Sequence, residues 1–340
     1  MIFKDRKTPF IIAEVGQNHQ GSFENALKYI DTFSQLGANA IKFQNRNNKY
    51  LFAEESYNKP YESDNSFGKT YGEHREFLEL SLDEIKEIRA YLKKKNLYFI
   101  STPFDEPSLE FLLSIDIDII KIASFDIGNL PFINRIAKAQ KPTVVSIGGG
   151  KSDQVKSSIE ILKKKTSDLA LLHCVSEYPC TYDRLGLENI KLLKSEFPEV
   201  TVGLSDHFNG ILSGPIAFMM GAVVFEKHVT FNRANKGTDH SFSLEAEGFR
   251  KFARDINRVP AMMKTKDQST LGKEPVFIKL GKSVVTNQNL KKNDVLTLDN
   301  LSGKIFNKQY IPVRETNKII GKKINVDLAE GKPIKFEYLH

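Results

Sequence analysis

The 340-residue sequence has only two cysteines, no tryptophan and no long apolar run. Cys174 and Cys180 are too few for a disulfide framework, which excludes a small disulfide-stapled scaffold. The opening residues, 1 to 6, lack the apolar stretch of a secretory signal peptide, so we expect a cytoplasmic protein. No segment approaches the ~20 apolar residues that span a bilayer, and we therefore expect no membrane partner.

The charge excess is small and scattered. Lysine and arginine number 49 against 42 aspartates and glutamates, a net charge of +7. The basic runs 93–95 and 163–165 end helical patterns, where cations complement the helix dipole. No basic stripe is interleaved with aromatics, so we expect no nucleic-acid partner. Because 40% of the residues are hydrophobic, the chain should bury a core.

Short β-branched runs alternate with amphipathic helical patterns up to about residue 260. The predicted strands are 9–16, 40–44, 98–103, 119–124, 142–148, 169–175, 200–206 and 223–229. The helical patterns include 23–36, 81–95, 152–165, 187–197 and 243–259, with Ser81, Ser152 and Ser243 as expected N-caps. Eight βα units predict an α/β protein with a (β/α)₈ TIM barrel, since a doubly wound sheet usually has fewer strands and a glycine-rich fingerprint.

The chain departs from this pattern in two places. The connection from residue 45 to residue 80 is far longer than a normal βα loop, which is typical of a functional segment at a barrel mouth. After a polar stretch the pattern changes, and residues 289–301 and 327–339 form an imperfect repeat. We therefore predict a catalytic barrel at 1–262, a linker at 263–279 and a small β-rich domain at 280–340.

Polar side chains end several predicted strands, where a barrel presents its active site. Glu14, Lys42 and Lys121 are the charged ones. The uncharged ones are Gln44, Ser101, Thr102, Ser124 and Ser146. Two buried lysines need anionic partners, which indicates a phosphate or carboxylate site. An internal salt bridge with Glu14 or Glu226 is an alternative, and so is a Schiff-base lysine of an aldolase.

Two histidines end neighbouring strands. His207 closes the seventh predicted strand and His228 the eighth, so their imidazoles should lie at the same height in the barrel. Such a pair suits a divalent ion that polarises a carbonyl group. Asp239 follows shortly afterwards as a further ligand or substrate contact.

These motifs resemble those of the sialic acid synthase family, whose members condense phosphoenolpyruvate with N-acetylmannosamine or its 6-phosphate. The resemblance is carried along the whole chain by residues 10–21, 42–44, 121–124, 203–207, 226–228 and 236–240. The tail resembles the family's antifreeze-like (SAF) domain. Residues 68–74 and 280–285, together with Asp126, are most similar to the animal branch, which makes the 9-phosphorylated product.

The resemblance implies a metal-dependent transferase that forms a carbon–carbon bond. It places Glu14, Lys42, Lys121 and Asp126 among the catalytic residues; Lys42, Thr102, Lys121, Ser124, Ser146 and Ser205 around phosphoenolpyruvate; and Glu14, Gln44, Tyr178 and Asp239 around the amino sugar. His207 and His228 would bind Mn²⁺, or Mg²⁺ or Co²⁺. It also implies a domain-swapped homodimer.

Some positions depart from the bacterial members of the family. Lys304-Ile305-Phe306 occupies the region from which those members present an arginine to the sugar, and Ser176 stands where they often have asparagine. A sugar phosphate would need cationic donors, for which the candidates are Lys69, His74, Arg75 and Lys304. A related synthase for legionaminic acid, pseudaminic acid or KDN, and a non-catalytic carbohydrate-binding protein, remain alternatives.

Overall fold

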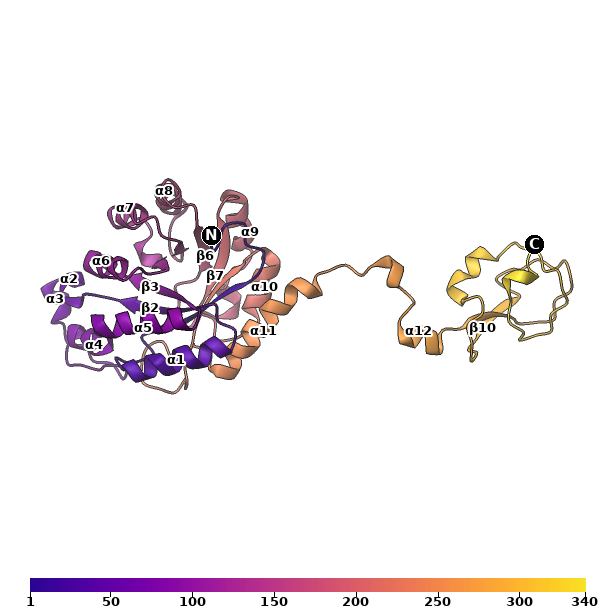
Figure 1. Cartoon of the computed structure of the whole chain (residues 1–340), viewed down its shortest axis with the longest axis horizontal. Coiled ribbons are helices and arrows are strands. Elements are labelled where there is room, and N and C mark those ends of the chain that lie inside the picture. The colour runs from indigo at the N-terminus through magenta and orange to yellow at the C-terminus, as the bar shows by residue number, and fades with distance from the viewer. The chain divides into compact units, whose positions relative to one another are not determined.

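The computed structural model describes residues 1–340, which form two compact units, Met1–Met263 and Lys264–His340. The first unit is a closed barrel of eight parallel strands in chain order, confirming the predicted (β/α)₈ fold (Figure 1). The strands are β1 Phe10–Gly16, β2 Ala40–Asn45, β3 Tyr98–Pro103, β4 Ile119–Ile122, β5 Thr143–Ser146, β6 Leu169–Cys174, β7 Thr201–Asp206 and β8 Val224–His228. Each predicted strand ends within two residues of the observed one.

Helices surround the strands of this unit (Figure 1). They are α1 Phe23–Gln35, α5 Leu82–Lys94, α6 Glu106–Ser114, α7 Leu130–Lys138, α8 Ser152–Lys163, α9 Asn189–Glu196, α10 Ser213–Met220 and α11 Ala246–Met262. Ser81 caps α5 in a capping box with Glu84, as expected. The other two expected caps are wrong: α8 is preceded by Lys151 and α11 by Glu245. None of the helices is both long and apolar enough to cross a membrane.

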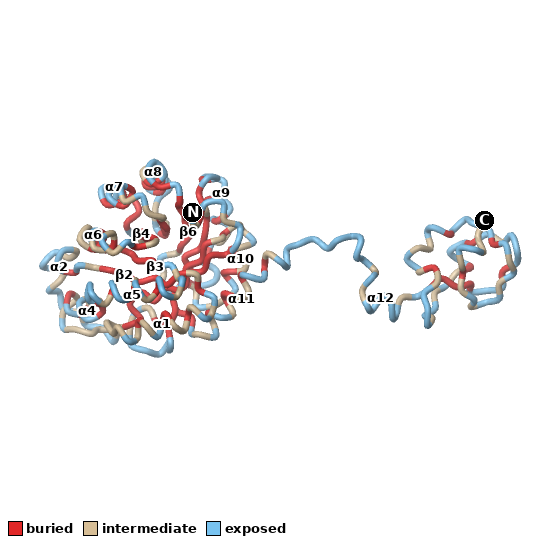
Figure 2. Tube along the Cα trace, viewed as in Figure 1, coloured by how far each residue is buried: buried red, intermediate tan, exposed pale blue.

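The barrel has two apolar layers. Inside it, Phe10, Ile12 and Ile100 pack together and against Phe3. The backbone N–H groups of residues 2 to 4 donate to the buried carboxylate of Asp168, which ties this N-terminal segment to the barrel. A larger cluster lies between the strands and the helices, and Figure 2 shows the buried strands at the centre of the unit. The cluster that fills the barrel below the site is therefore apolar.

An ion pair outside the strand barrel joins β7 to β8. The Lys227 ammonium lies 2.7 Å from Asp206, and both side chains are fully buried. The same carboxylate accepts hydrogen bonds from the Ser213 hydroxyl at 2.6 Å and from the Phe208 N–H at 3.0 Å, while Lys227 also donates to the Phe208 carbonyl. This network holds the segment that leaves β7 against α10.

The long connection after β2 is folded rather than irregular. It contains three short helices, α2 Asn48–Leu51, α3 Glu54–Tyr57 and α4 Tyr71–Leu78. The side chains of Arg46 and Glu79, at its two ends, form an ion pair with an N–O distance of 3.2 Å and are nearly buried. The connection is therefore a closed insertion, residues 46–79, whose ends are held together.

The second unit is small. Its two strands, β9 Ser283–Thr286 and β10 Leu301–Lys304, are antiparallel, and its core includes Val284, Leu296 and Ile319. The two repeat segments meet where Leu290 and Leu328 exchange backbone hydrogen bonds of 2.8 and 2.9 Å. The segment expected as a linker contains a short turn of 3₁₀-helix at Gln268–Thr270 and most of the helix α12, Pro275–Leu280.

Candidate active site

The strand register brings polar residues together inside the barrel. Glu14 lies opposite Lys42 of β2 and His228 of β8. Ser205 lies opposite Glu226. Residues paired in a parallel ladder point to the same face, so these side chains share the interior at the carboxyl end of the strands.

They line a cavity of about 840 Å³, a size typical of ligand sites. The predicted residues along it are Glu14, Lys42, Gln44, Thr102, Lys121, Ser124, Ser146, Tyr178, Ser205, His207, His228 and Asp239. Ser101 does not line the cavity, and its hydroxyl donates to the Asn45 side chain at 2.7 Å. Asp126 does not line it either. Its neighbours Phe125 and Ile127 line the cavity, while its own carboxylate accepts a hydrogen bond from Asn129 at 3.1 Å.

The two buried lysines have different surroundings. The Lys42 ammonium lies 2.7 Å from Glu14 and 3.6 Å from Glu226, so the salt-bridge alternative is right for this lysine. Lys121 forms no ion pair within 4 Å and donates to the Ile122 carbonyl at 2.9 Å. A buried ammonium without a close carboxylate is stabilised by an anionic ligand.

The two carboxylates beside Lys42 have pKa values that are shifted in opposite directions. Burial raises the pKa of Glu14 to about 7, against the opposing effect of Lys42. Burial also acts on Glu226, but Lys121, Lys42 and the nearby imidazoles outweigh it and lower the pKa of Glu226 to about 2. Glu14 is therefore the carboxylate of this coupled group that is easier to protonate, and Glu226 is the one that stays ionised more readily.

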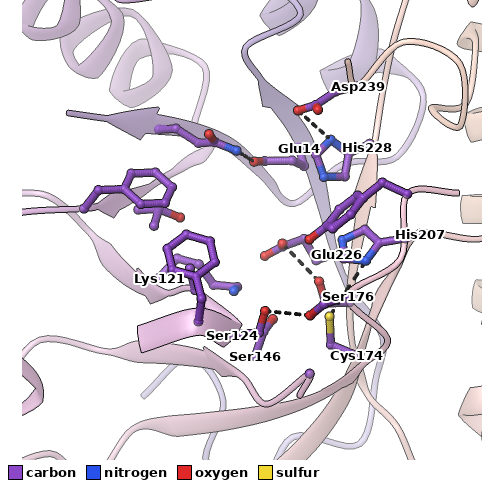
Figure 3. A pocket seen from close by; sticks show the side chains of 18 of the residues that line it. Glu14, Lys121, Ser124, Ser146, Cys174, Ser176, His207, Glu226, His228 and Asp239 are labelled. Carbon is purple, nitrogen blue, oxygen red and sulfur yellow. Dashed lines mark hydrogen bonds and ion pairs between the residues drawn. The ribbon is translucent and has the colours of Figure 1, made fainter. Parts of the chain in front are cut away.

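The hydroxyls of Ser124, Ser146 and Ser176 lie in the part of the cavity near Lys121 (Figure 3). Glycines also line the cavity. The Ser124 and Ser176 hydroxyls are 2.9 Å apart, and the buried Ser146 hydroxyl has no partner in the protein. A Cβ on Gly148 would lie 2.5 Å from the Ser176 hydroxyl, so only glycine leaves this space open. This set of donors fits a phosphate group.

The two histidines lie close together on another side of the cavity. Their ring centroids are 5.6 Å apart (Figure 3). His207 Nδ1 lies 2.8 Å from the Val175 carbonyl and donates to it, which leaves Nε2 as the acceptor. His228 Nδ1 is buried without a hydrogen-bond partner, 3.8 Å from the Asp239 carboxylate. Burial lowers the pKa of both imidazoles, that of His228 to about 3, so both are neutral.

Neutral imidazoles with a free nitrogen are the donors that a divalent transition-metal ion prefers. No group of three or more histidine, cysteine, aspartate or glutamate side chains is placed to hold an ion. His207 and His228 are thus the two side chains here that could hold such an ion.

A further group of residues surrounds the space between Glu14 and Asp239. Gln44 donates to Glu14 at 2.9 Å. A Cβ on Gly16 would lie 3.2 Å from Glu14 and 3.5 Å from Asp239, which shows how closely these groups converge. The Tyr178 ring packs on His207 with a centroid separation of 4.1 Å and remains half exposed. Carboxylates, an amide and an aromatic ring suit a sugar.

Sequence reasoning missed several lining residues. Gln17, Arg46 and Phe104 line the cavity, and the only signal for Arg46 is that it follows directly after β2. Of the cations proposed for a sugar phosphate within this unit, Arg75 lines the cavity, whereas Lys69 is exposed and His74 is buried away from it.

Buried polar atoms without a hydrogen-bond partner gather in this cavity. They include Glu14 Oε2, Gln17 Nε2, Ser146 Oγ, Glu226 Oε2 and His228 Nδ1. Buried polar groups in native proteins are nearly always satisfied, so each such atom needs an explanation. Their convergence indicates a site built for a polar ligand.

Comparisons with known proteins show which family the chain is similar to. Residues 29–268 match the model of the NeuB family. The N-acetylneuraminate-9-phosphate synthase of Mus musculus is 34% identical over 96% of this chain and 92% of its own length. The N,N'-diacetyllegionaminic acid synthase of Campylobacter jejuni is 32% identical over 88% of this chain and 90% of its own length.

Among solved structures, the N-acetylneuraminic acid (sialic acid) synthetase of Leptospira borgpetersenii has a TM-score of 0.69 and 33% identity. The match covers 78% of this chain and 90% of that one. The family match spans most of the barrel, and the relatives align over nearly their whole length. The chain therefore belongs to the NeuB family.

Proposed function

We propose that this protein condenses phosphoenolpyruvate with an N-acetylated amino sugar, N-acetylmannosamine or its 6-phosphate, to give a sialic acid or its 9-phosphate plus phosphate. The observation that carries the proposal is one cavity that joins an anion site around Lys121 to a sugar-like site around Glu14 and Asp239. The names of the similar synthases support the same reaction class.

Phosphoenolpyruvate would bind with its phosphate against Lys121 and the hydroxyls of Ser124 and Ser146. These groups are fixed by the barrel and need no reorganisation as charge develops, which is the main source of electrostatic catalysis. The carboxylate of the substrate would meet Lys42, whose ammonium is held by Glu14 and Glu226.

The reaction then needs one new carbon–carbon bond and the loss of phosphate. C3 of phosphoenolpyruvate attacks the open-chain sugar aldehyde, water adds at C2, and the C2–O bond to phosphate breaks. One proton of the water ends on the former aldehyde oxygen, and the other passes from the C2 hydroxyl to the departing phosphate as the C2 ketone forms. Glu14 is the candidate general acid–base for these proton transfers, because its pKa is about 7 and it lies beside the proposed sugar site.

We propose that His207 and His228 hold a divalent ion, Mn²⁺ or a similar metal such as Mg²⁺ or Co²⁺. When bound, such an ion would polarise the carbonyl group of the acceptor. Both imidazoles are neutral and His228 Nδ1 has no protein partner, which supports this assignment. Asp239, 3.8 Å from His228, orients that ring or contacts the sugar.

We also propose that two copies form a homodimer in which the second unit of each copy contributes to the barrel site of the other. The second unit has a small core and exposes the apolar residues Phe277, Ile278 and Leu280 of α12. Large exposed apolar side chains grouped on one short helix are typical of an interface.

The direct test incubates the purified protein with phosphoenolpyruvate, Mn²⁺ and a panel of 2-acetamido sugars and their phosphates. We expect phosphate release together with a product whose mass equals the sugar plus pyruvate. Lys121→Met is the inactive control. Sugar binding without phosphate release would indicate a carbohydrate-binding protein instead, and borohydride trapping at a lysine would indicate an aldolase.

The panel also decides between related acceptors. Sugars that lead to legionaminic acid, pseudaminic acid or KDN differ from N-acetylmannosamine in their substituents and not in the condensing atoms. A product formed only from one of them would keep the reaction class and change the substrate.

A further inference from the structure

The backbone beside His207 is held from the outer face of the strand barrel. Strand β7 ends at Asp206, which lies opposite Lys227 of β8 in the register of the two strands. Side chains alternate between the two faces of a strand, so these two residues face the helices. His207 and His228, which directly follow them in the chain, line the cavity. Each member of this buried ion pair therefore precedes one of the two histidines.

The ion pair binds both polar backbone groups of Phe208, the residue that follows His207. The Phe208 N–H donates to the Asp206 carboxylate at 3.0 Å, and the Lys227 ammonium donates to the Phe208 carbonyl. The two residues that flank His207 in the chain are thus fixed by the same pair of charges. Both charged side chains are fully buried, so these bonds lie in a low-dielectric environment that strengthens them.

Two further hydrogen bonds hold His207 itself. Its carbonyl accepts from the Cys180 N–H at 3.1 Å, and its Nδ1 lies 2.8 Å from the Val175 carbonyl. Both partners lie on the loop after β6 and set the orientation of the ring. The ion pair has a different effect, because it ties the backbone at His207 to β8, the strand that carries His228. The distance of 5.6 Å between the two ring centroids depends on that tie.

Stability alone does not explain why this pair is charged. Apolar residues of similar volume often replace a buried ion pair without loss, because taking two charges out of water is costly. An apolar pair could not bind the N–H and the carbonyl of Phe208. The charges of Asp206 and Lys227 therefore add directional bonds to the backbone beside His207.

We propose that Asp206 and Lys227 are positioning residues that fix the spacing at which His207 and His228 bind a divalent ion. This inference rests on the metal binding included in the proposed function, and it assigns the residues that set the affinity of that site. Replacing groups that orient metal ligands typically lowers metal affinity by roughly 10- to 100-fold.

The test measures Mn²⁺ affinity in the full-length protein by electron paramagnetic resonance of the free ion, with the stability of each variant measured by urea unfolding. The double variant Asp206→Asn with Lys227→Met removes both charges, which a buried pair tolerates, but methionine cannot donate to the Phe208 carbonyl. We expect it to remain stable and to bind Mn²⁺ at least about 10-fold more weakly than the wild type.

Two single variants are the matched controls. Asp206→Asn keeps an acceptor for the Phe208 N–H and leaves Lys227 as the donor to the Phe208 carbonyl, so it should lose stability and keep its Mn²⁺ affinity within about threefold. Ser213→Ala removes a neutral hydrogen bond to the same carboxylate and touches neither backbone group of Phe208, so it should also keep its affinity.

The outcomes separate this inference from the proposed function. A stable double variant with wild-type Mn²⁺ affinity would overturn the inference, and so would losses of affinity that simply follow the losses of stability across the three variants. A wild type that binds Mn²⁺ but forms no product would refute the condensation, while the affinities still decide the positioning role. A wild type that binds no Mn²⁺ would refute the metal assignment and this inference together.

Discussion

The buried ion pair between Lys227 and Asp206 gives a quantitative prediction for stability. Lys227→Met removes the ammonium and leaves a fully buried carboxylate without its charge partner. Breaking a buried pair from one side costs about 3 to 5 kcal/mol. Asp206 keeps its hydrogen bonds from Ser213 and from the Phe208 N–H, so we expect a value near the lower end, about 3 kcal/mol.

The double variant Asp206→Asn with Lys227→Met removes both charges and keeps a side chain that accepts the Ser213 hydrogen bond. We expect it to be within about 1 to 2 kcal/mol of the wild type, so the coupling free energy should exceed roughly 2 kcal/mol. Lys156→Met, which removes a surface pair with Glu196 at 2.9 Å, is the control and should cost less than about 1 kcal/mol.

Urea unfolding followed by far-UV circular dichroism measures these three variants and the single variant Asp206→Asn, which completes the double-mutant cycle, because the barrel contains most of the helices. In thermal scans the Lys227→Met variant should melt roughly 6 to 12 °C lower. Two results would refute the view that this pair is shielded from water and energetically coupled. One is that the losses of unfolding free energy from the two substitutions are additive, and the other is that Lys227→Met costs no more than Lys156→Met.

Three further predictions concern the active site. Since burial raises the pKa of Glu14 from 4.5 to about 7, the folded protein keeps a proton that the unfolded chain has lost between those values. The free energy of unfolding of the wild type, relative to that of Glu14→Gln, should therefore fall by up to about 3 kcal/mol as the pH rises through this range. Urea titrations of both proteins at pH 4.5 and at pH 7 measure this change, and a difference between the two proteins that does not vary with pH would contradict it. His207→Ala and His228→Ala should each abolish product formation with little change in melting temperature, and full activity after exhaustive chelation would contradict the metal role. A chain truncated at about residue 270 should remain folded but show a raised KM for the sugar, and an unchanged KM would count against the shared site in the dimer.

The strands and the inner half of the site were predictable because their signals are local. A β-branched run marks a strand wherever it lies, and a lysine inside such a run, such as Lys42 or Lys121, needs an anionic partner. The strand ends of a barrel also meet at one face, so Glu14 and His228 had to be close.

The remaining features depend on contacts between distant segments. Ser243 was expected as an N-cap, but its hydroxyl donates to the Asp239 carbonyl and accepts from the Asn18 side chain. It therefore stabilises the loop after β8 instead of capping α11. Arg46 lies in the cavity because Glu79, 33 positions later, holds it there. No local sequence pattern reveals the Asn18–Ser243 or the Arg46–Glu79 contact, because the partners are far apart along the chain.

The Arg46–Glu79 pair makes the insertion replaceable. A loop whose two ends are fastened together places few demands on the barrel, and extending it costs only about 0.6 kcal/mol for each doubling of length. The face that supplies Arg75 can therefore change its length and its side chains while β2 and α5 stay where they are. Substitutions confined to residues 47–78, in evolution or in a laboratory library, can thus change which acceptor binds. The residues proposed to bind phosphoenolpyruvate stay in place.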